Sequence, residues 1–242
     1  MRPVFLIALL VANSLFAQTV EWAVTTQDPT NQSRCHSFGI DLDSDGNVYV
    51  CGDFRYTVDF DPGPGNYSLV NNTTDDVGFL KKMDADGNFL AAIPLGFENT
   101  YDVFVDDNHN VYIWGDFDGT KDFDPDSNSV FNLTAVGTYG DPALLKLDSA
   151  WNFVWARTLV DFSARDIALD NQGNLVMTGF FSGTRDFDPG PGTFFLTTAT
   201  SSASYISKLD GDWSFLNAWM VSDGTGTYGA GITNSLAVSS SN

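Results

Sequence analysis

The sequence has little positive charge. Of its 242 residues only 11 are Lys or Arg, against 31 Asp or Glu, and the formal net charge is −20. Proteins that bind nucleic acid or anionic lipid do so largely through Lys and Arg side chains that contact phosphate groups. We therefore expect no nucleic-acid partner and no membrane surface recognised through a basic patch.

Cysteine is also scarce, which excludes a disulfide-rich scaffold. The two cysteines are Cys35 and Cys51. A hairpin turn at residues 43–47 would place Leu42 opposite Val48 and Cys51 opposite Gly39, leaving Cys35 four residues further along its strand. At about 3.3 Å per residue the two sulfurs would lie about 13 Å apart, beyond the reach of a disulfide. The pattern predicts two thiols, unless the segment before Gly39 folds back.

Histidine is equally rare. His36 and His109 are the only two, and neither lies in a motif typical of a nucleophilic triad or a zinc site. Catalysis that depends on histidine is therefore not expected.

No hydrophobic run is long enough to span a membrane. The longest, residues 4–12, follows Arg2 and precedes Ala17-Gln18. This order is typical of a secretory signal peptide, and the run is too short to cross about 30 Å of hydrocarbon. We interpret residues 1–17 as a signal peptide and residues 18–242 as the mature repeat domain. The protein should be secreted or held at the cell surface, without membrane insertion after cleavage.

An internal repeat organises the rest of the chain. Three segments align with their glycines, aromatics and carboxylates in register, namely GDFRYTVDFDPGPG (52–65), GDFDGTKDFDPDSN (115–128) and GFFSGTRDFDPGPG (179–192). Asp59, Asp122 and Asp186 occupy the same position, 63 and 64 residues apart. Periods of this order indicate an array of supersecondary units.

Each unit contains four short apolar segments separated by turns rich in Asp, Asn and Gly, and none has a helical period. The segments expected as main strands are 38–42, 48–51, 78–83 and 89–93 in the first unit, 102–105, 111–114, 143–147 and 153–156 in the second, and 165–169, 175–178, 205–209 and 215–219 in the third. A further short strand should follow each signature, at 67–69, 130–133 and 193–196. The second strands are apolar at successive positions, which predicts burial of both faces.

Four strands in hairpin order are typical of one blade of a β-propeller. The sequence therefore predicts an all-β fold with three complete four-stranded blades, at about 36–97, 100–160 and 163–222, plus partial terminal blades, the last beginning at 228–242. Such an arrangement would form an open or incomplete ring. We accordingly expect the chain to be the N-terminal portion of a longer protein.

The repeat resembles the secreted bacterial β-propeller repeats of the SBBP type. The resemblance is carried by DNQGNLVMTG (170–179), by the DFDPGPG run, by SKLD (207–210) and by the closing phenylalanine strand, and it covers nearly all of the mature chain. It implies an exported bacterial protein. It does not imply one activity, because propellers host many unrelated functions.

The paired carboxylates of the signature are the candidate metal site. They are Asp59 and Asp61, Asp122 and Asp124, and Asp186 and Asp188. Residues i and i+2 of an extended segment share a face, so each pair could supply part of a calcium shell while Phe60, Phe123 or Phe187 points into the core. In the alternative, Asp61, Asp124 and Asp188 cap the turn and the other three are solvated.

A second acidic run, DLDSDG (41–46), matches the opening of a calcium loop but has Gly52 where the last acidic ligand should stand. We interpret it as a hairpin turn.

The resulting prediction is a binding or scaffold module outside the cell, able to bind calcium for stability, with no catalysis expected. Its partner would be a protein or a polysaccharide. The alternative is a carbohydrate-active propeller that binds or hydrolyses glycosides through loop aspartates. A functional carboxylate pair should break the repeat symmetry, whereas structural aspartates should recur in every unit. Trp155 and Trp219 are expected to pack between blades.

Overall fold

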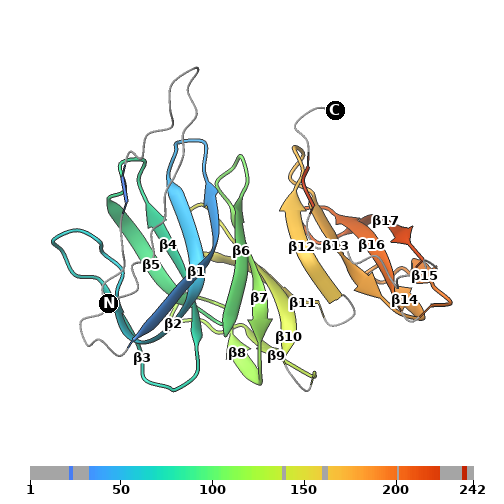
Figure 1. The fold of residues 1–242 in the computed structure, drawn as a ribbon, viewed down its shortest axis with the longest axis horizontal. Coiled ribbons are helices and arrows are strands. Elements are labelled where there is room, and N and C mark those ends of the chain that lie inside the picture. Colours follow the sequence, from blue (N-terminus) through green and yellow to red (C-terminus); the bar gives the residue numbers. More distant parts are fainter. Residues whose placement is uncertain are drawn as a thin grey trace. The chain divides into compact units, whose positions relative to one another are not determined.

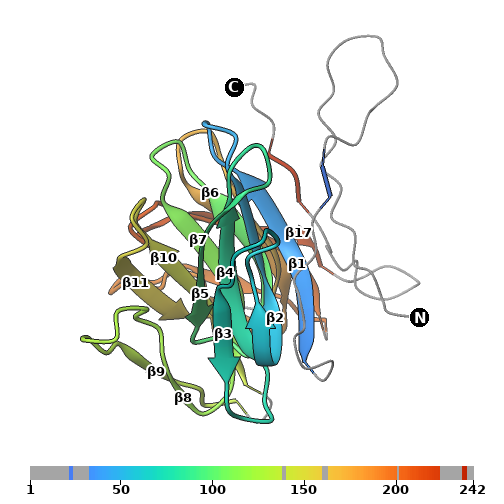
Figure 2. The same ribbon diagram turned by 90° about the vertical axis from the view of Figure 1, so that its left-hand side faces the viewer.

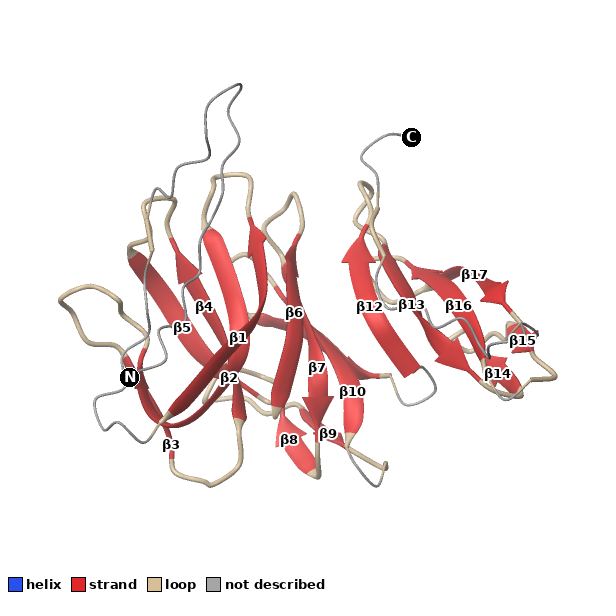
Figure 3. Cartoon of the chain, viewed as in Figure 1, coloured by secondary structure: helices blue, strands red, loops and turns tan. Residues whose placement is uncertain are grey.

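The computed structural model describes residues 22–23, 33–137, 140–159, 163–200, 202–223 and 236–238. This part of the chain consists of strands and loops, with no helix (Figure 3). Accordingly, no helix among these residues has the length and apolarity needed to cross a bilayer. The predicted signal peptide, and all but residues 236–238 of the predicted further unit, lie outside the described residues. The fold is all-β and built from antiparallel sheets, as predicted.

The first sheet has the strand order β1-β2-β4-β5, with β3 paired to the end of β2 (Figure 1). Its strands are β1 (Arg34–Leu42), β2 (Val48–Asp59), β3 (Ser68–Asn71), β4 (Val77–Met83) and β5 (Phe89–Leu95).

The second sheet has the order β11-β10-β7-β6, and β8 and β9 form a separate short hairpin (Figure 2). Its strands are β6 (Asn99–Val105), β7 (Val111–Phe117), β10 (Asp141–Leu147) and β11 (Phe153–Thr158), and the hairpin is β8 (Thr120–Asp122) with β9 (Asn132–Thr134).

The third sheet repeats this plan in the order β12-β13-β16-β17, again with a short hairpin, β14-β15. Its strands are β12 (Ser163–Leu169), β13 (Leu175–Phe181), β14 (Thr184–Asp186), β15 (Phe195–Thr197), β16 (Ala203–Leu209) and β17 (Phe215–Ser222). The chain divides into two compact units, residues 1–134 with 145–156, and residues 135–144 with 157–242.

The predicted register of the first hairpin is confirmed. Leu42 lies opposite Val48, Gly39 opposite Cys51, and Cys35 opposite Phe54, with a bulge between Ser37 and Gly39. Cys35 and Cys51 accordingly form no disulfide with each other and are both thiols. The predicted burial of the second strands is confirmed in the first two units, where residues 48–51 and 111–114 are at most 6% exposed. In the third unit Val176 is only half-buried.

The edge strand β6 of the second sheet packs closely against β1 and β2 of the first sheet. The Thr100 hydroxyl of β6 donates a hydrogen bond of 2.7 Å to the Gly52 carbonyl of β2, and the Val105 amide donates one of 2.8 Å to Asp41 of β1. A Cβ atom on Gly39 would lie 2.5 Å from the Asp102 carboxylate. Glycine at position 39 is therefore required by the close approach of β6.

The strands β8 and β14 were not predicted, because the signature was interpreted as the start of a connection. Gly119 and Gly183 break the chain just before these strands, each with φ 66°. The equivalent residue in the first unit is Tyr56, also at φ 66°, and there β2 continues to Asp59. A left-handed residue thus redirects the chain at the same point in all three units.

We expect Gly119→Ala to lower the free energy of unfolding by about 1 kcal/mol, because a residue with a Cβ is strained at positive φ. A Cβ at this position would meet no atom within 4 Å, so the conformational term acts alone. Urea denaturation followed by tryptophan fluorescence would measure the change. Gly119→Asn is the control and should lose less, because Asn tolerates this conformation. Equal losses in both variants would contradict the conformational explanation.

Candidate functional site

The central phenylalanine of each Asp-Phe-Asp segment is in the core, as predicted. Phe60, Phe123 and Phe187 are at most 1% exposed. Phe60 packs against Phe79 with ring centroids 4.7 Å apart, and Phe187 packs against Tyr205 at 4.8 Å. Each segment is therefore anchored by its aromatic ring.

The first aspartate of each segment closes the loop that follows it. Asp59 Oδ1 accepts hydrogen bonds from the backbone amides of Asp61 at 3.1 Å and Tyr67 at 2.8 Å. Asp122 and Asp186 make the same two bonds, with 2.8 Å to the amides of Phe131 and Phe194. Asp59 is only 6% exposed, so the expectation that these aspartates are merely solvated is wrong for it.

The second aspartate of each segment caps the turn. Asp61 Oδ1 accepts the Gly63 amide at 2.7 Å, and Asp188 Oδ1 accepts the Gly190 amide at 2.8 Å. Asp124 accepts the Asp126 amide at 2.9 Å and the Ser129 hydroxyl at 2.7 Å. The turn-capping role considered for these three residues is therefore confirmed, and calcium binding stays a prediction.

One of the pairs borders a pocket. Asp122, Phe123, Asp124 and Pro125 line a space of about 190 Å³ together with residues 94–96 at the end of β5. A Cβ on Gly96 would lie 2.4 Å from the Asp122 carbonyl oxygen, so this corner also requires glycine.

Calcium binding to these loops predicts a higher melting temperature in calcium and a lower one in chelator. A ligand that binds only the folded state at 100 times its Kd adds about 2.7 kcal/mol of stability per site. Thermal melts in millimolar CaCl2 and in EDTA would measure this shift. Magnesium at the same concentration is the control for ionic strength. An unchanged midpoint would contradict the metal prediction. The six carboxylates would then act only as hydrogen-bond acceptors that stabilise the loops.

A second kind of aspartate builds the hairpin turns. Six turns share one arrangement, in which the first Asp accepts backbone amides two and four residues later, as in Asp43, Asp84, Asp106, Asp148, Asp170 and Asp210. The interpretation of residues 41–46 as a hairpin turn is confirmed, since Asp43 makes these bonds and Asp41 instead accepts the Val105 amide.

Asp43, Asp45 and His109 form the one group of potential metal ligands found among the described residues, with ligand atoms within 4.8 Å of one another. However, Asp43 Oδ2 already lies 3.3 Å from Lys82 Nζ and accepts bonds from Asn47 and Tyr49. A metal ion would have to compete with that ammonium group, so this cluster is better explained as part of the turn.

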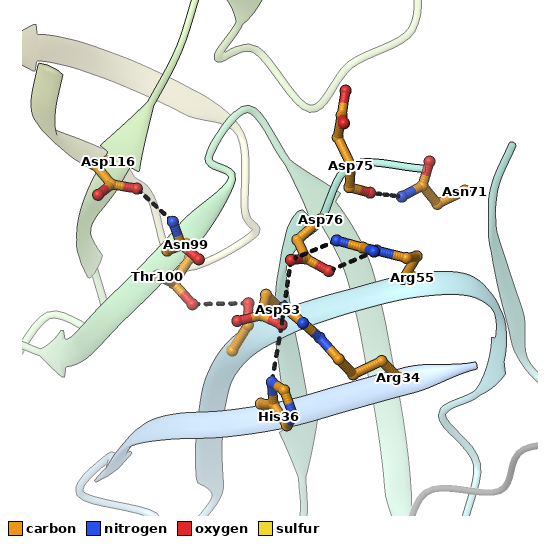
Figure 4. Close-up of polar contacts among 11 residues, drawn as sticks. Arg34, His36, Asp53, Arg55, Asn71, Asp75, Asp76, Asn99, Thr100 and Asp116 are labelled. Atoms are coloured by element: carbon orange, nitrogen blue, oxygen red, sulfur yellow. Dashed lines mark hydrogen bonds and ion pairs between the residues drawn. The ribbon is translucent and has the colours of Figure 1, made fainter. Parts of the chain in front are cut away.

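The polar cluster that departs most from the repeat lies at the open end of the first hairpin (Figure 4). We call it the Asp53 network, comprising Arg34, His36, Asp53, Arg55 and Asp76. His36 of β1 lies directly opposite Asp53 of β2, with 3.3 Å between His36 Nδ1 and Asp53 Oδ1. Arg34 lies 3.7 Å from the same carboxylate. Asp53 is only 1% exposed, so this charge is buried among its partners.

Asp76 links the two arginines of the network. Arg55 binds it through two nitrogens, at 3.1 and 3.0 Å, and Arg34 contacts the same carboxylate. Bidentate pairing of this kind fixes the guanidinium plane as well as its position. The loop before Asp76 is ordered by the Asn71 amide, which donates to the Asp75 carbonyl at 2.7 Å (Figure 4).

Burial raises the pKa of Asp53, and the neighbouring charge of Asp76 raises it further, while His36 and Arg34 oppose the shift. A carboxyl group of this kind takes up a proton at a higher pH than an ordinary aspartate.

The network breaks the repeat symmetry. The position of Asp53, one residue after the first glycine of the signature, holds Asp116 in the second unit and Phe180 in the third. Asp116 there accepts a 2.8 Å bond from Asn99 and contacts the Tyr101 hydroxyl. This site was not predicted from the sequence, although the residue after that glycine differs in the third unit and gave a signal.

The predictions for the two tryptophans have different outcomes. Trp155 is 7% exposed and packs against Tyr112 of its own sheet, at 6.2 Å between ring centroids, so its packing between blades stays a prediction. Trp219 is 47% exposed, so its expected packing is wrong. The two residues are not equivalent, because Trp155 comes seven residues after its turn aspartate, Asp148, and Trp219 nine after Asp210.

No protein-family model matches the sequence, and a search of curated proteins finds no significant match.

Proposed function

We propose that the chain is an exported binding or scaffold module of the β-propeller type that acts at the cell surface or outside the cell. The observation that carries the proposal is the identical use of Asp59, Asp122 and Asp186, each closing its own loop with the same two bonds. Carboxylates that recur in this way stabilise the loops of the fold, so we interpret the acidic composition as a structural feature.

The propeller geometry is supported by the strand plan. Each main sheet contains a run of four hydrogen-bonded antiparallel strands, to which the first sheet adds β3, and the edge strands β1 and β6 of successive sheets contact each other. The predicted signal peptide and the resemblance to secreted bacterial propeller repeats support export.

The surface best suited to a partner is the Asp53 network with the neighbouring aromatic ring of Phe38. Phe38 is 56% exposed and lies 6.0 Å from the His36 ring, and the Arg34 side chain is 45% exposed. An exposed ring beside charged hydrogen-bonding groups suits a polysaccharide, whose sugar rings stack on aromatics and whose hydroxyls bond to carboxylates and guanidinium groups.

Affinity electrophoresis through gels containing soluble polysaccharides tests this proposal. We expect one or more polysaccharides to retard the chain, and we expect Phe38→Ala to abolish most of the retardation. Phe195→Ala is the matched control, because Phe195 is also an exposed phenylalanine, at 60%, but lies outside the network. Equal retardation of both variants would contradict the assignment of the binding surface.

One observation favours the alternative of a glycoside-active protein. Asp53 and Asp76 are two carboxylates held by the same arginine, Arg34, and the raised pKa of Asp53 suits a general acid. A reducing-end assay on the same polysaccharides decides between the two. Our proposal expects no release of reducing ends. Release that is lost in both Asp53→Asn and Asp76→Asn, with the fold retained, would replace it with the alternative.

A further inference from the structure

A lysine occupies the centre of an apolar sheet face. Lys81 of β4 lies directly opposite Val50 of β2 and Ala92 of β5. Its neighbours along the same face of β4 are Phe79 and Met83, because alternate residues of a strand share a face. All four of these neighbours are at most 2% exposed, and Lys81 itself is 4% exposed.

This face is the main core of the first sheet. Other side chains pack against it and are partly buried, namely Trp22, Cys35, Leu69, Val77 and Phe89. No hydrogen bond or ion pair joins Lys81 to another residue in the described part of the chain, and its neighbouring ionisable groups, Cys35, Asp61 and Asp59, act on it only through space. Lys82, the next residue, is instead paired with Asp43 at 3.3 Å.

The equivalent positions in the other two sheets hold no charge. They are Leu145 in β10 and Ser207 in β16, both 0% exposed, each one residue before a lysine that matches Lys82. An apolar or small residue therefore satisfies this position structurally. A residue that contradicts its local environment without a compensating contact is a candidate for function.

We propose that Lys81 is a reactive amine that captures small, uncharged aldehydes as an imine. Burial lowers its pKa to about 8, with Cys35, Asp61 and Asp59 opposing the shift, so about a tenth of the amine is neutral at pH 7, far more than for an ordinary lysine. Lysines desolvated by apolar surroundings are activated nucleophiles in this way. The proposal does not rest on the proposed polysaccharide binding.

The reaction balances without any cofactor. The Nζ lone pair attacks the aldehyde carbon, and a proton moves from nitrogen to oxygen to give a carbinolamine. Loss of the hydroxyl group and the remaining amine proton as water then leaves a carbon–nitrogen double bond. The apolar neighbours of Lys81 leave the residue only 4% exposed, which limits the access of the water that would hydrolyse the imine. Asp59 and Asp61 make the surroundings negative, so a neutral aldehyde should be preferred to an anionic one.

Reductive trapping tests the proposal. The purified chain is incubated at pH 7 with glycolaldehyde and cyanoborohydride, and the labelled fraction of each lysine is followed by peptide mass spectrometry. We expect Lys81 to be labelled at least about tenfold faster than Lys82, whose pKa is raised by Tyr49 and Asp43 despite the opposing effect of burial. Its rate should level off above about pH 8. Glyoxylate, an anionic aldehyde, should label Lys81 more slowly than glycolaldehyde.

Two controls make the result decisive. In 8 M urea the preference for Lys81 should disappear, and Lys81→Met should remove the fast label while leaving the Lys82 rate unchanged. Labelling of Lys81 no faster than Lys82 in the folded protein would overturn the proposal. A preference that survives in urea would overturn it as well, because it would then come from local sequence and not from burial.

Discussion

Replacing Lys81 by Met should raise the free energy of unfolding by about 3 kcal/mol at pH 7. The pKa of Lys81 falls from 10.5 to about 8 on folding, mainly because of burial. A difference of about 2.5 pKa units corresponds to about 3 kcal/mol. At pH 7, where the lysine is mostly charged in both states, burial of the charge lowers the stability of the wild-type protein by this amount. Met has similar length and shape, and it fits a face formed by Val50, Phe79, Met83 and Ala92.

The sign of the pH dependence follows from the same shift. Between about pH 8 and 10.5 the unfolded chain binds a proton that the folded protein releases, so wild-type stability rises with pH across this window. Below about pH 8 the full cost remains. The advantage of Lys81→Met should therefore be constant from pH 6 to 7 and shrink towards pH 10.5, as measured by urea denaturation.

Lys82→Met is the matched control, because it removes a lysine from the opposite face of the same strand. Lys82 is paired with Asp43 and lies 4.7 Å from the centre of the Tyr49 ring. This variant should lose stability. A gain in Lys82→Met equal to that in Lys81→Met, or no gain in Lys81→Met, would contradict the buried-charge explanation.

Asp43→Ala should lower the free energy of unfolding by about 2–4 kcal/mol, because several donors would lose a charged acceptor at once. The Asp45 and Asn47 amides, the Tyr49 hydroxyl and Lys82 all lie within 3.3 Å of this carboxylate. The Asp43 side chain is fully buried. Chemical denaturation of wild type and variant at pH 7 would measure the loss.

Asp84→Ala is the control for the turn alone. Asp84 makes the same bonds to Asp86 and Asn88 but is only half-buried, and it has no lysine or tyrosine partner among the described residues. Its loss should be clearly smaller than that of Asp43→Ala. Equal losses would show that the turn, and not the buried charge, carries the effect.

Acid should act through the same residue. Burial would raise the pKa of Asp43, but hydrogen bonds from Asn47, with those from Lys82 and Tyr49, outweigh it and hold the pKa at about 2. The stability contributed by Asp43 is thus complete above about pH 4 and is lost as the pH falls towards 2. Asp43→Ala should lack this part of the acid transition.

The sequence predicted the main strands well because strand period, turn residues and repeat all agree. The Leu42–Val48 register followed from the turn at residues 43–47, and burial of Val48 to Cys51 followed from their continuous apolarity. These features depend on residues that are close in sequence, so the sequence alone is enough to predict them.

The Asp53 network and Lys81 could not be predicted in the same way. Arg34 joins Asp53 to Asp76, and it lies 42 positions before Asp76 in the sequence, while Arg55, which also binds Asp76, lies 21 positions before it. Lys81 and Lys82 are adjacent in sequence, and only the pairing of β4 with β2 and β5 decides which of them faces the core. The short strands β8 and β14 were missed because two residues, the second at φ 66°, separate each of them from the strand before.

The loop after each Asp-Phe-Asp segment tolerates a change in length. The closing bond spans eight residues from Asp59 to Tyr67 and from Asp186 to Phe194, but nine from Asp122 to Phe131, and its length is 2.8 Å in all three. The aromatic residue that ends each loop also stacks on the outer strand of its own sheet, as Tyr67 does on Phe89 at 4.9 Å. Each loop is thus fastened at both ends within its own unit. Foreign peptides inserted between these fasteners could be displayed on the surface without disturbing the sheet beneath.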